Sequence, residues 1–436
     1  MKKKKVDLLV LSDRYPPYSV GGAELSLHAI LRRVPRCKSL IVISVYSNNM
    51  DYKNYVHEGI DVIQLEMYPQ FPFHSMEPAV YKLVNKSKSL MSFYEKKTAN
   101  LYYEKYKLYD LSGDNSHEFM LKHGSEKNIF EEAYTLSHIE NICKNLDIDT
   151  LHADNFRSIA LSQKIDARKK VYTIRDNRFH ENIIQEGLND TQINLLMSNS
   201  EYRLSLLDTA DIVTVTSKHL LDNLIHVKPN INYIRIPNPA DEINDSDYLS
   251  EDINKENEFN IVIIGMLNEN KGQVQFIKEL RNRIKANPDI KINLIGKGKR
   301  IERRIREICR ESNIQDQVIL HGYLSREKTY SLINSSQVVV LPTMWEEPFG
   351  RVPLEAGLMS KPVVAFAVGG LRETIINNET GFLVEKGDFK TMFDKILYIK
   401  SNDDIRFKLG CNGKEHIQNN YNVKDIANKY FKIWDV

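Results

Sequence analysis

The chain has 436 residues, of which 42% are hydrophobic and 27% are charged, and its formal net charge is +2. This length exceeds what one hydrophobic core holds, which predicts two domains of about 200 residues each. The near-neutral charge balance excludes a general attraction to nucleic acid or anionic membrane, so no nucleic-acid partner is expected.

Cysteine usage and apolar runs indicate the compartment. Cys37, Cys143, Cys309 and Cys411 lie far apart without metal-ligand spacing, so we expect reduced thiols. No apolar run reaches membrane-spanning length, and the run after the basic start is too short for a signal peptide. We therefore expect a cytoplasmic protein. Peripheral contact with the inner face of the membrane is compatible with that location.

A glycine pair closes the first loop. A strand is expected at 6–11, followed by the loop SDRYPPYSVGG and a helix from about Ala23. Gly21 and Gly22 would let the backbone approach a ligand phosphate at the helix N-terminus. A flexible turn is the alternative, and the G-x-G-x-x-G dinucleotide fingerprint is absent.

Apolar runs of strand length recur through the first half, at 39–47, 59–68, 150–154, 170–176, 210–217 and 231–239. Their alternation with helical segments predicts a parallel, doubly wound sheet, interrupted by a helical insertion at about 69–137. The first domain is thus predicted at 1–240, and an acidic linker at 241–258.

The second half repeats this alternation, with strand-length runs at 260–267, 290–298, 317–324, 337–344 and 362–370. It predicts a second domain at 259–420. A terminal helix at 421–436 follows, and packing back on the first domain is one arrangement for its apolar stripe. The fold class expected is α/β, with two Rossmann-like domains that face each other across a cleft.

Two carboxylates mark the candidate site within 337–370. A buried strand ends in the turn Glu-Pro-Phe-Gly, and a helix begins near Arg351 with unpaired N–H groups that favour phosphate. A carboxylate can bind two vicinal hydroxyls, so Glu347 facing a hexose and Glu355 facing a ribose are chemically coherent. Two solvated surface acids are the alternative.

The segment EPFGRVPLE at 347–355, followed by AGLMSKPVVAFAVGGLRETI and NETGFLVEKGD, resembles the retaining GT-B glycosyltransferases of family 4. Weaker similarity extends over the chain through GGAE, ADIVTVTS and IPNP, and the insertion lies outside it. The resemblance implies metal-independent, retaining transfer of a sugar from a nucleoside-diphosphate donor to a glycan or lipid-linked acceptor in cell-surface polysaccharide synthesis. It implies no cofactor besides that donor.

The resemblance also implies roles for individual residues. Glu347 would shield positive charge at the anomeric carbon, and Lys271 would neutralise the departing diphosphate. Glu355 would hold the donor ribose, while the backbone around Phe349 and Gly350 would face the sugar and phosphates. The other donor-binding candidates are Gly21, Gly22, Arg175 and Arg351, and candidates for a supporting role are His152, Asp176, His321 and Gly296.

Two positions depart from the family pattern. Met266 stands where members commonly have an arginine that binds the diphosphate, so Arg351, Arg372 or another cation would have to substitute. Arg175 stands where many members have histidine. These departures support an alternative, a catalytically silent GT-B subunit that binds donor or stabilises a partner enzyme, whereas the intact Glu347, Glu355 and Lys271 argue against it.

Two further features leave alternatives open. D-x-D sequences of the kind that bind metal in GT-A glycosyltransferases occur at 147–149 and 245–247, but the first leads into a strand and the second lies in the linker. No metal is therefore expected. Lysines and aromatic residues alternate through 80–110, which indicates either a helix at an anionic lipid surface or a solvated helical cap.

Overall fold

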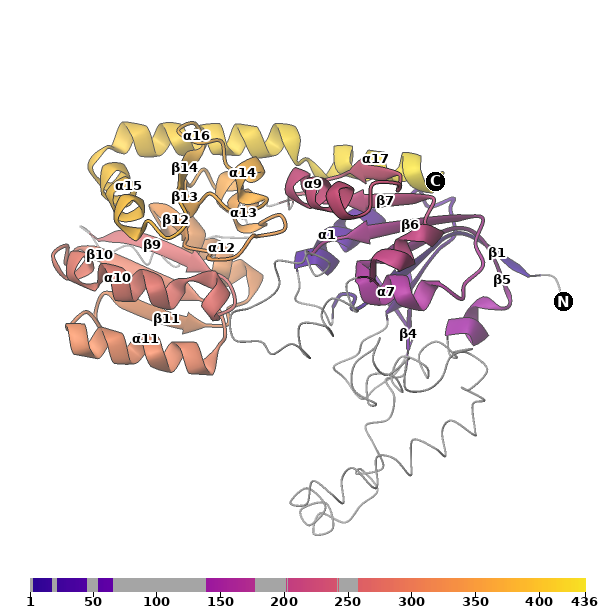
Figure 1. Ribbon diagram of the computed structural model, residues 1–436, viewed down its shortest axis with the longest axis horizontal. Coiled ribbons are helices and arrows are strands. Elements are labelled where there is room, and N and C mark those ends of the chain that lie inside the picture. Colours follow the sequence, from indigo (N-terminus) through magenta and orange to yellow (C-terminus); the bar gives the residue numbers. More distant parts are fainter. Residues whose placement is uncertain are drawn as a thin grey trace, which may run out of the picture. The chain divides into compact units, whose positions relative to one another are not determined.

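The computed structural model describes residues 3–17, 22–44, 54–65, 139–176, 201, 203–240, 242 and 258–436. The predicted insertion at 69–137 with its basic segment 80–110, nearly all of the linker, and Gly21 lie outside these residues. The chain divides into two compact units (Figure 1). Unit 1 comprises Met1–Val215, Asn223–Ile234 and Lys429–Val436, and unit 2 comprises Thr216–Asp222 and Arg235–Asn428.

Unit 1 is built on an eight-stranded sheet in the order β3-β4-β2-β1-β5-β6-β7-β8. Only β3 and β4 pair antiparallel among the pairings described; the others are parallel. The strands are β1 (Lys4–Ser12), β2 (Leu40–Ser44), β3 (Tyr55–His57), β4 (Ile60–Gln64), β5 (Leu146–Asp154), β6 (Lys169–Ile174), β7 (Ile212–Val215) and β8 (Tyr233–Arg235). The longer helices described in this part of the chain are α1 (Gly22–Leu31), α7 (Asn155–Ser162) and α9 (Lys218–Val227).

The central strands of unit 1 are apolar on both faces. Leu8, Leu9 and Leu11 of β1 are fully buried, as expected for a parallel sheet that helices cover on both sides. The last helix, α17 (Val423–Trp434), ends in this unit with Trp434 fully buried. The side-chain hydroxyl of Thr150 donates to the Trp434 carbonyl at 2.9 Å, which fixes the chain end against β5.

Unit 2 is built on a six-stranded parallel sheet in the order β11-β10-β9-β12-β13-β14. Its strands are β9 (Phe259–Ile264), β10 (Ile290–Ile295), β11 (Val318–Gly322), β12 (Val338–Leu341), β13 (Val363–Phe366) and β14 (Gly381–Val384). Its helices are α10 (Gln273–Lys285), α11 (Lys299–Ser312), α12 (Arg326–Ser335), α13 (Val352–Leu358), α14 (Leu371–Thr374), α15 (Phe389–Ser401) and α16 (Asp403–Asn420).

Each sheet has a point where the strand order reverses direction. In unit 1 the chain moves from β1 outward through β2 to β4 and then resumes with β5 on the other side of β1. In unit 2 the corresponding step is from β11 to β12, which lies beside β9. Because open α/β sheets bind ligands outside the carboxyl ends of the strands at such points, the β1/β5 and β9/β12 pairs locate the places to search.

The doubly wound organisation predicted from the sequence is confirmed in both sheets. Two short strands were not predicted, β3 with three residues and β14 with four, because each is too short to show a period. Several predicted strands run too far at their carboxyl ends; the run at 362–370, for example, is a strand only to Phe366. Within the part of the chain that the structure describes, no helix combines the length and apolarity needed to span a bilayer.

Candidate functional site

A lysine and a glutamate meet at the β9/β12 reversal of unit 2. Lys271 ends a single helical turn that follows β9, and the side chain of Asn268 caps this turn by accepting from the Lys271 backbone N–H at 3.0 Å. Glu347 lies in the loop after β12. The Lys271 Nζ donates to Glu347 Oε2 at 2.5 Å, and the two side chains are 24% and 17% exposed. The two residues predicted to be catalytic therefore lie together in a partly buried ion pair.

A glycine permits this approach. Gly272 follows Lys271 with φ +70°, and a β-carbon there would lie only 1.8 Å from the Pro342 carbonyl oxygen at the end of β12. Any side chain would push the first turn of α10 away from β12. Gly272 thus brings Lys271 within reach of Glu347.

Trp345 is a third member of the site that sequence reasoning missed. Its indole Nε1 donates to Glu347 Oε2 at 3.0 Å, the same oxygen that Lys271 contacts. The Lys271 Nζ also lies 5.7 Å from the centre of the Trp345 ring, within cation–π range. The sequence offered one signal for it: tryptophan, whose indole has an N–H donor, stands two positions before Glu347. Together, these contacts fix one carboxylate oxygen of Glu347 between a cation and a neutral donor.

The Gly369-Gly370 turn holds the backbone of the Glu347 loop. The Gly370 N–H donates to the Glu347 carbonyl at 2.7 Å, and the Gly369 N–H donates to the side chain of Glu346 at 2.7 Å. A β-carbon on Gly369, whose φ is +47°, would lie 2.1 Å from the Glu347 carbonyl oxygen. The two loops therefore pack backbone against backbone, which sets the position of Glu347.

Phe349 and Gly350 continue this loop in different roles. The Phe349 side chain is 4% exposed and packs edge-on against Tyr421, with ring centroids 5.9 Å apart. Gly350 has φ +87°, and a β-carbon there would lie 2.4 Å from Leu371 Cδ2. The Phe349 ring belongs to the core. Only the backbone of Phe349 and Gly350 can therefore face a donor sugar, as the prediction for these residues states.

Glu355 lies on α13 beside a second cation. The Arg351 Nε is 3.9 Å from Glu355 Oε1, and the side chains are 13% and 18% exposed. The structure therefore shows neither glutamate as a solvated surface acid, since each lies largely buried against a basic side chain. Met266, by contrast, is 67% exposed at the position where an arginine was expected.

His321 and Gly296 have structural contacts. The His321 Nε2 is 2.9 Å from Asn293 Oδ1, and the Asn293 amide in turn donates to Asn260 Oδ1 at 3.1 Å. Burial lowers the pKa of His321. A β-carbon on Gly296 would lie 1.9 Å from the Gly265 carbonyl oxygen, so this glycine permits close packing of the loops after β9 and β10.

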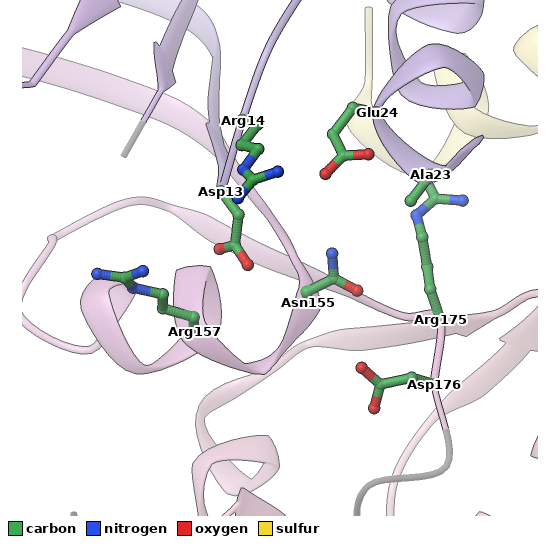
Figure 2. Close-up of a pocket in the computed structure, with 8 residues that line it drawn as sticks. All are labelled: Asp13, Arg14, Ala23, Glu24, Asn155, Arg157, Arg175 and Asp176. Carbon is green, nitrogen blue, oxygen red and sulfur yellow. The ribbon is translucent and has the colours of Figure 1, made fainter. Parts of the chain in front are cut away.

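Unit 1 has a polar cavity of about 430 Å³ at its own strand reversal. Residues at the carboxyl ends of β1, β5 and β6 and in the first turn of α1 line it: Asp13, Arg14, Ala23, Glu24, Asn155, Arg157, Arg175 and Asp176 (Figure 2). The side chains of Glu24 and Asn155 point toward one another across this space. The predicted residues Arg175 and Asp176 thus belong to the cavity, and Gly22 begins the helix that supplies Ala23 and Glu24.

Arg175 is held by a buried acid. Its Nε donates to Asp154 Oδ1 at 2.6 Å, and the two side chains are 6% and 1% exposed. Burial raises the pKa of Asp154 to about 6, although the Arg175 guanidinium opposes this shift. Asp154, which directly precedes the lining residue Asn155, therefore partly balances the positive charge of Arg175.

His152 lies in the core of unit 1. It is fully buried, and the Trp434 indole N–H donates to its Nδ1 at 3.2 Å. Because Nδ1 accepts that bond, the ring proton lies on Nε2, which is 3.4 Å from the Thr173 hydroxyl. Burial, assisted by Arg175, lowers the His152 pKa to about 3. These contacts give His152 a structural role rather than a place in the cavity lining.

The D-x-D sequence at 147–149 lies at the opposite end of β5 from the cavity. Arg168 donates to Asp147 at 2.9 Å, and Lys5 pairs with Asp149 at 3.1 Å. Both aspartates therefore have basic partners at the amino end of the sheet. The second sequence, at 245–247, lies outside the described residues.

Comparison with known proteins assigns the second half of the chain. Residues 246–416 match the sequence family described as glycosyl transferases group 1. This segment is a glycosyl transferases group 1 domain. It contains Lys271, Trp345 and Glu347, so the constellation at the β9/β12 reversal lies within that domain.

Curated relatives resemble this chain over part of their length. The capsular polysaccharide biosynthesis glycosyltransferase CapM of Staphylococcus aureus is 38% identical over 96 residues, which are 22% of this chain and 25% of CapM. The matches to the first three relatives cover 25%, 35% and 60% of those proteins. The similarity therefore covers less than two thirds of any of them.

Solved structures match over nearly the whole chain. Sucrose-phosphate synthase from Thermosynechococcus elongatus has a TM-score of 0.67 at 19% identity and covers 99% of this chain and 98% of that one. Anabaena Alr3699/HepE in complex with UDP-glucose has a TM-score of 0.65 at 17% identity, with 98% of both chains covered. At these identities the likeness shows the fold alone, and it confirms the predicted α/β GT-B class with two Rossmann-like units, of which unit 2 contains the group 1 domain.

Proposed function

We propose that this chain is a retaining glycosyltransferase of family 4 type that moves a sugar from a nucleoside-diphosphate donor to a glycan or lipid-linked acceptor. The observation that carries the proposal is the Lys271–Glu347–Trp345 constellation at the strand reversal of the group 1 domain. A lysine and a glutamate side by side can stabilise the two opposite charges that develop during glycosyl transfer. The departing diphosphate becomes more negative, and the anomeric carbon becomes more positive.

The chemistry assigns each group a role. Lys271 would leave Glu347 and neutralise the diphosphate as the glycosidic bond breaks. Glu347, still held by the Trp345 N–H, would face the sugar and stabilise its positive charge. The acceptor hydroxyl would attack from the face that the diphosphate leaves, which retains the anomeric configuration. This route uses no metal and no cofactor besides the donor.

Donor binding would use the second acid of the domain. Glu355 would accept hydrogen bonds from the ribose hydroxyls, with Arg351 beside it, 3.9 Å from Glu355 Oε1. Because Met266 offers no charge, Arg351 is also a candidate for the missing cation. A UDP-sugar donor is supported by the likeness to a protein solved with UDP-glucose.

The unit 1 cavity is the acceptor-side site in this proposal. Its lining combines carboxylates and guanidinium groups, which accept from and donate to the hydroxyl groups of a sugar. The name of CapM supports an acceptor in cell-surface polysaccharide synthesis. Contact of residues 80–110 with the inner face of the membrane belongs to the same proposal and concerns residues outside those described.

Release of nucleoside diphosphate tests the function. The full chain is incubated with a panel of nucleotide sugars and with glycan and lipid-linked acceptors, and Glu347→Gln serves as the matched variant. We expect acceptor-dependent release from one donor, and little release from the variant. Donor binding without any release, in both proteins, would instead identify the catalytically silent subunit that the exposed Met266 keeps as the second candidate.

A further inference from the structure

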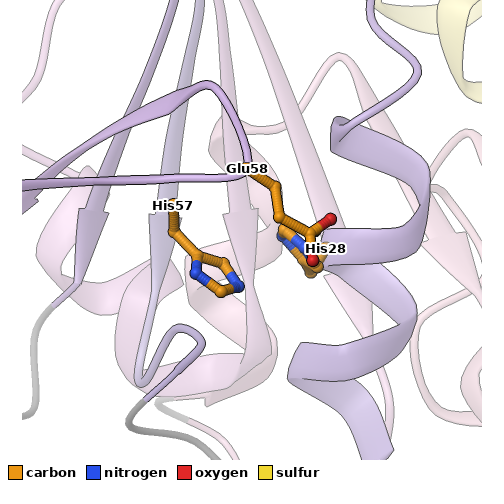
Figure 3. Close-up of side chains that lie close together, drawn as sticks. All are labelled: His28, His57 and Glu58. Atoms are coloured by element: carbon orange, nitrogen blue, oxygen red, sulfur yellow. Dashed lines mark ion pairs between the residues drawn. The ribbon is translucent and has the colours of Figure 1, made fainter.

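We propose that His28, His57 and Glu58 form a binding site for a divalent first-row transition-metal ion such as zinc. The three residues come from two elements of unit 1: His28 from the last turn of α1, and His57 and Glu58 from the connection of β3 to β4. Figure 3 shows the three side chains gathered between the hairpin and the helix. The site shares no residue with the group 1 domain, so it stands or falls independently of the proposed transfer reaction.

The spacing of the ligand atoms is close to that of a metal site. One ligand atom from each residue lies within 4.8 Å of the others. Two ligands of a tetrahedral zinc ion, at bond lengths of about 2.0–2.1 Å, are about 3.3 Å apart. The His28 Nε2 and Glu58 Oε2 are 3.3 Å apart, so one pair already has that separation. The third ligand atom, from His57, lies within 4.8 Å of both, so the His57 side chain would have to move closer to bind the same ion.

His28 is oriented as a metal ligand requires. Its Nδ1 is 2.9 Å from the Tyr15 hydroxyl oxygen, while its buried Nε2 faces Glu58 Oε2 at 3.3 Å. When Nδ1 carries the ring proton and donates to Tyr15, the lone pair of Nε2 points to the space beside Glu58. A partner on one ring nitrogen fixes the ring so that the other nitrogen can bind a metal.

Glu58 occupies an unusual backbone position for its residue type. Its φ is +46° and that of Gly59 is +82°, the conformation of a tight hairpin turn in which asparagine, aspartate or glycine is favoured at both places. A glutamate there costs backbone strain without serving the turn. A glutamate at this position is explained if its side chain, which is longer than that of aspartate or asparagine, is needed to reach His28.

Arg32 is the competitor for this carboxylate. Its Nη1 donates to Glu58 Oε2 at 3.3 Å, and its side chain is 37% exposed. A bound metal ion would take over the oxygen that Arg32 contacts and displace the guanidinium toward solvent. Removing Arg32 should therefore tighten metal binding, whereas removing a ligand should weaken it.

The ligand set selects the class of ion and indicates what binding would do. Two imidazoles and one carboxylate favour zinc, cobalt or nickel over magnesium or calcium. Tyr15, which contacts His28, precedes Pro16, whose carbonyl accepts from the Tyr55 hydroxyl of β3 at 2.9 Å. A metal ion would thus join α1, the β3–β4 hairpin and the segment that leads from β1 toward the unit 1 cavity.

Calorimetric titration of the chelator-treated full chain tests the site, with the exposed Cys37 and Cys411 replaced by serine to remove thiol ligands. We expect one equivalent of Zn²⁺ to bind, and one equivalent of Co²⁺ to give the visible absorption of a four-coordinate site. His57→Gln and Glu58→Asn should each weaken Zn²⁺ binding about tenfold or more, and asparagine suits the turn. His226→Gln is the matched control, and its Zn²⁺ affinity should equal that of the parent. The Arg32→Ala variant should bind Zn²⁺ more tightly than the parent.

Three outcomes would overturn the proposal. They are no saturable Zn²⁺ binding by the parent protein, an unchanged affinity in both His57→Gln and Glu58→Asn, or Mg²⁺ binding as tightly as Zn²⁺. Thermal unfolding of each variant without metal confirms that it is folded. A rise in the unfolding temperature with Zn²⁺ in the parent, and its loss in Glu58→Asn, gives a second readout independent of calorimetry.

Discussion

Replacing Trp345 by phenylalanine tests whether the indole N–H positions Glu347. Phenylalanine keeps an aromatic ring beside Lys271 and removes only the hydrogen bond to Glu347 Oε2, which is 3.0 Å long. Hydrogen bonds to charged groups contribute about 1.5–3 kcal/mol. Because Glu347 and Lys271 are 17% and 24% exposed, water can replace part of this contribution, and the lower end applies.

The expected effect is on turnover rather than on donor binding. A loss of about 1.5 kcal/mol corresponds to about a tenfold fall in kcat, with little change in KM, because Lys271 and Glu355 remain. The assay is nucleoside-diphosphate release at saturating donor and acceptor. Trp434→Phe is the matched control, since it removes the other indole of the chain, which donates to His152 in unit 1.

A double mutant separates positioning from general damage. If Trp345 acts through Glu347, then Trp345→Phe should cost little more once Glu347 is already glutamine, because the two changes remove one interaction. Full kcat in Trp345→Phe would refute the reasoning. Equal losses in the two Glu347 backgrounds would also refute it, because the tryptophan would then act by another route.

Three further predictions follow from the described contacts. Glu347→Gln should lower kcat about 10²–10³-fold, as loss of a transition-state electrostatic contact does, and thermal unfolding serves to show that the variant is folded although Lys271 has lost its partner; near-parent turnover would remove Glu347 from the mechanism. Gly369→Ala should destabilise unit 2 by about 1–3 kcal/mol in urea unfolding because its β-carbon would meet the Glu347 carbonyl, whereas Gly387→Ala, with φ +88° and open space around it, isolates the strain of the backbone alone, so equal losses would contradict the clash. The His152 pKa lies below its unfolded value, so its contribution to stability is complete above about pH 6.5 and falls by up to about 1.4 kcal/mol per pH unit on acidification toward its folded value of about 3; urea unfolding at pH 7.5 and 5.5 should show a smaller loss in His152→Gln, and parallel losses would exclude His152 as the cause.

The unit 2 site could be predicted from sequence because its parts are local. Glu347, Phe349, Gly350 and Glu355 lie in one strand–turn–helix segment, and the apolar run of β12 marks where the turn begins. The terminal helix predicted at 421–436 is also present, as α17 over 423–434. What the pattern could not supply is the direction of side chains within the turn, so Trp345 remained unnoticed and the Phe349 ring proved to belong to the core.

The unit 1 residues show the opposite case. Asp13, Glu24, Asn155 and Arg157 line the cavity with Arg175, but they come from the segments after β1, β5 and β6 and from α1, which are far apart in sequence. No single segment carries a pattern, because only the pairing of β1 with β5 and β6 brings the ends together. The His28, His57 and Glu58 cluster was missed for the same reason, since the separation of 28 from 57 matches no metal-ligand spacing.

The short Lys271–Glu347 contact has a consequence for how a donor would enter. In the ligand-free protein each group neutralises the other, so neither charge is left uncompensated in a partly buried place. A nucleoside-diphosphate sugar would bring an anion for Lys271 and, in the transition state, a cation for Glu347, and so would replace one pair by two. Trp345 would then matter most after Lys271 has moved, because its N–H is the contact that still holds Glu347 Oε2 in place. The indole is therefore expected to contribute more to turnover than to the stability of the ligand-free protein, which is the pattern that the Trp345→Phe measurements are designed to detect.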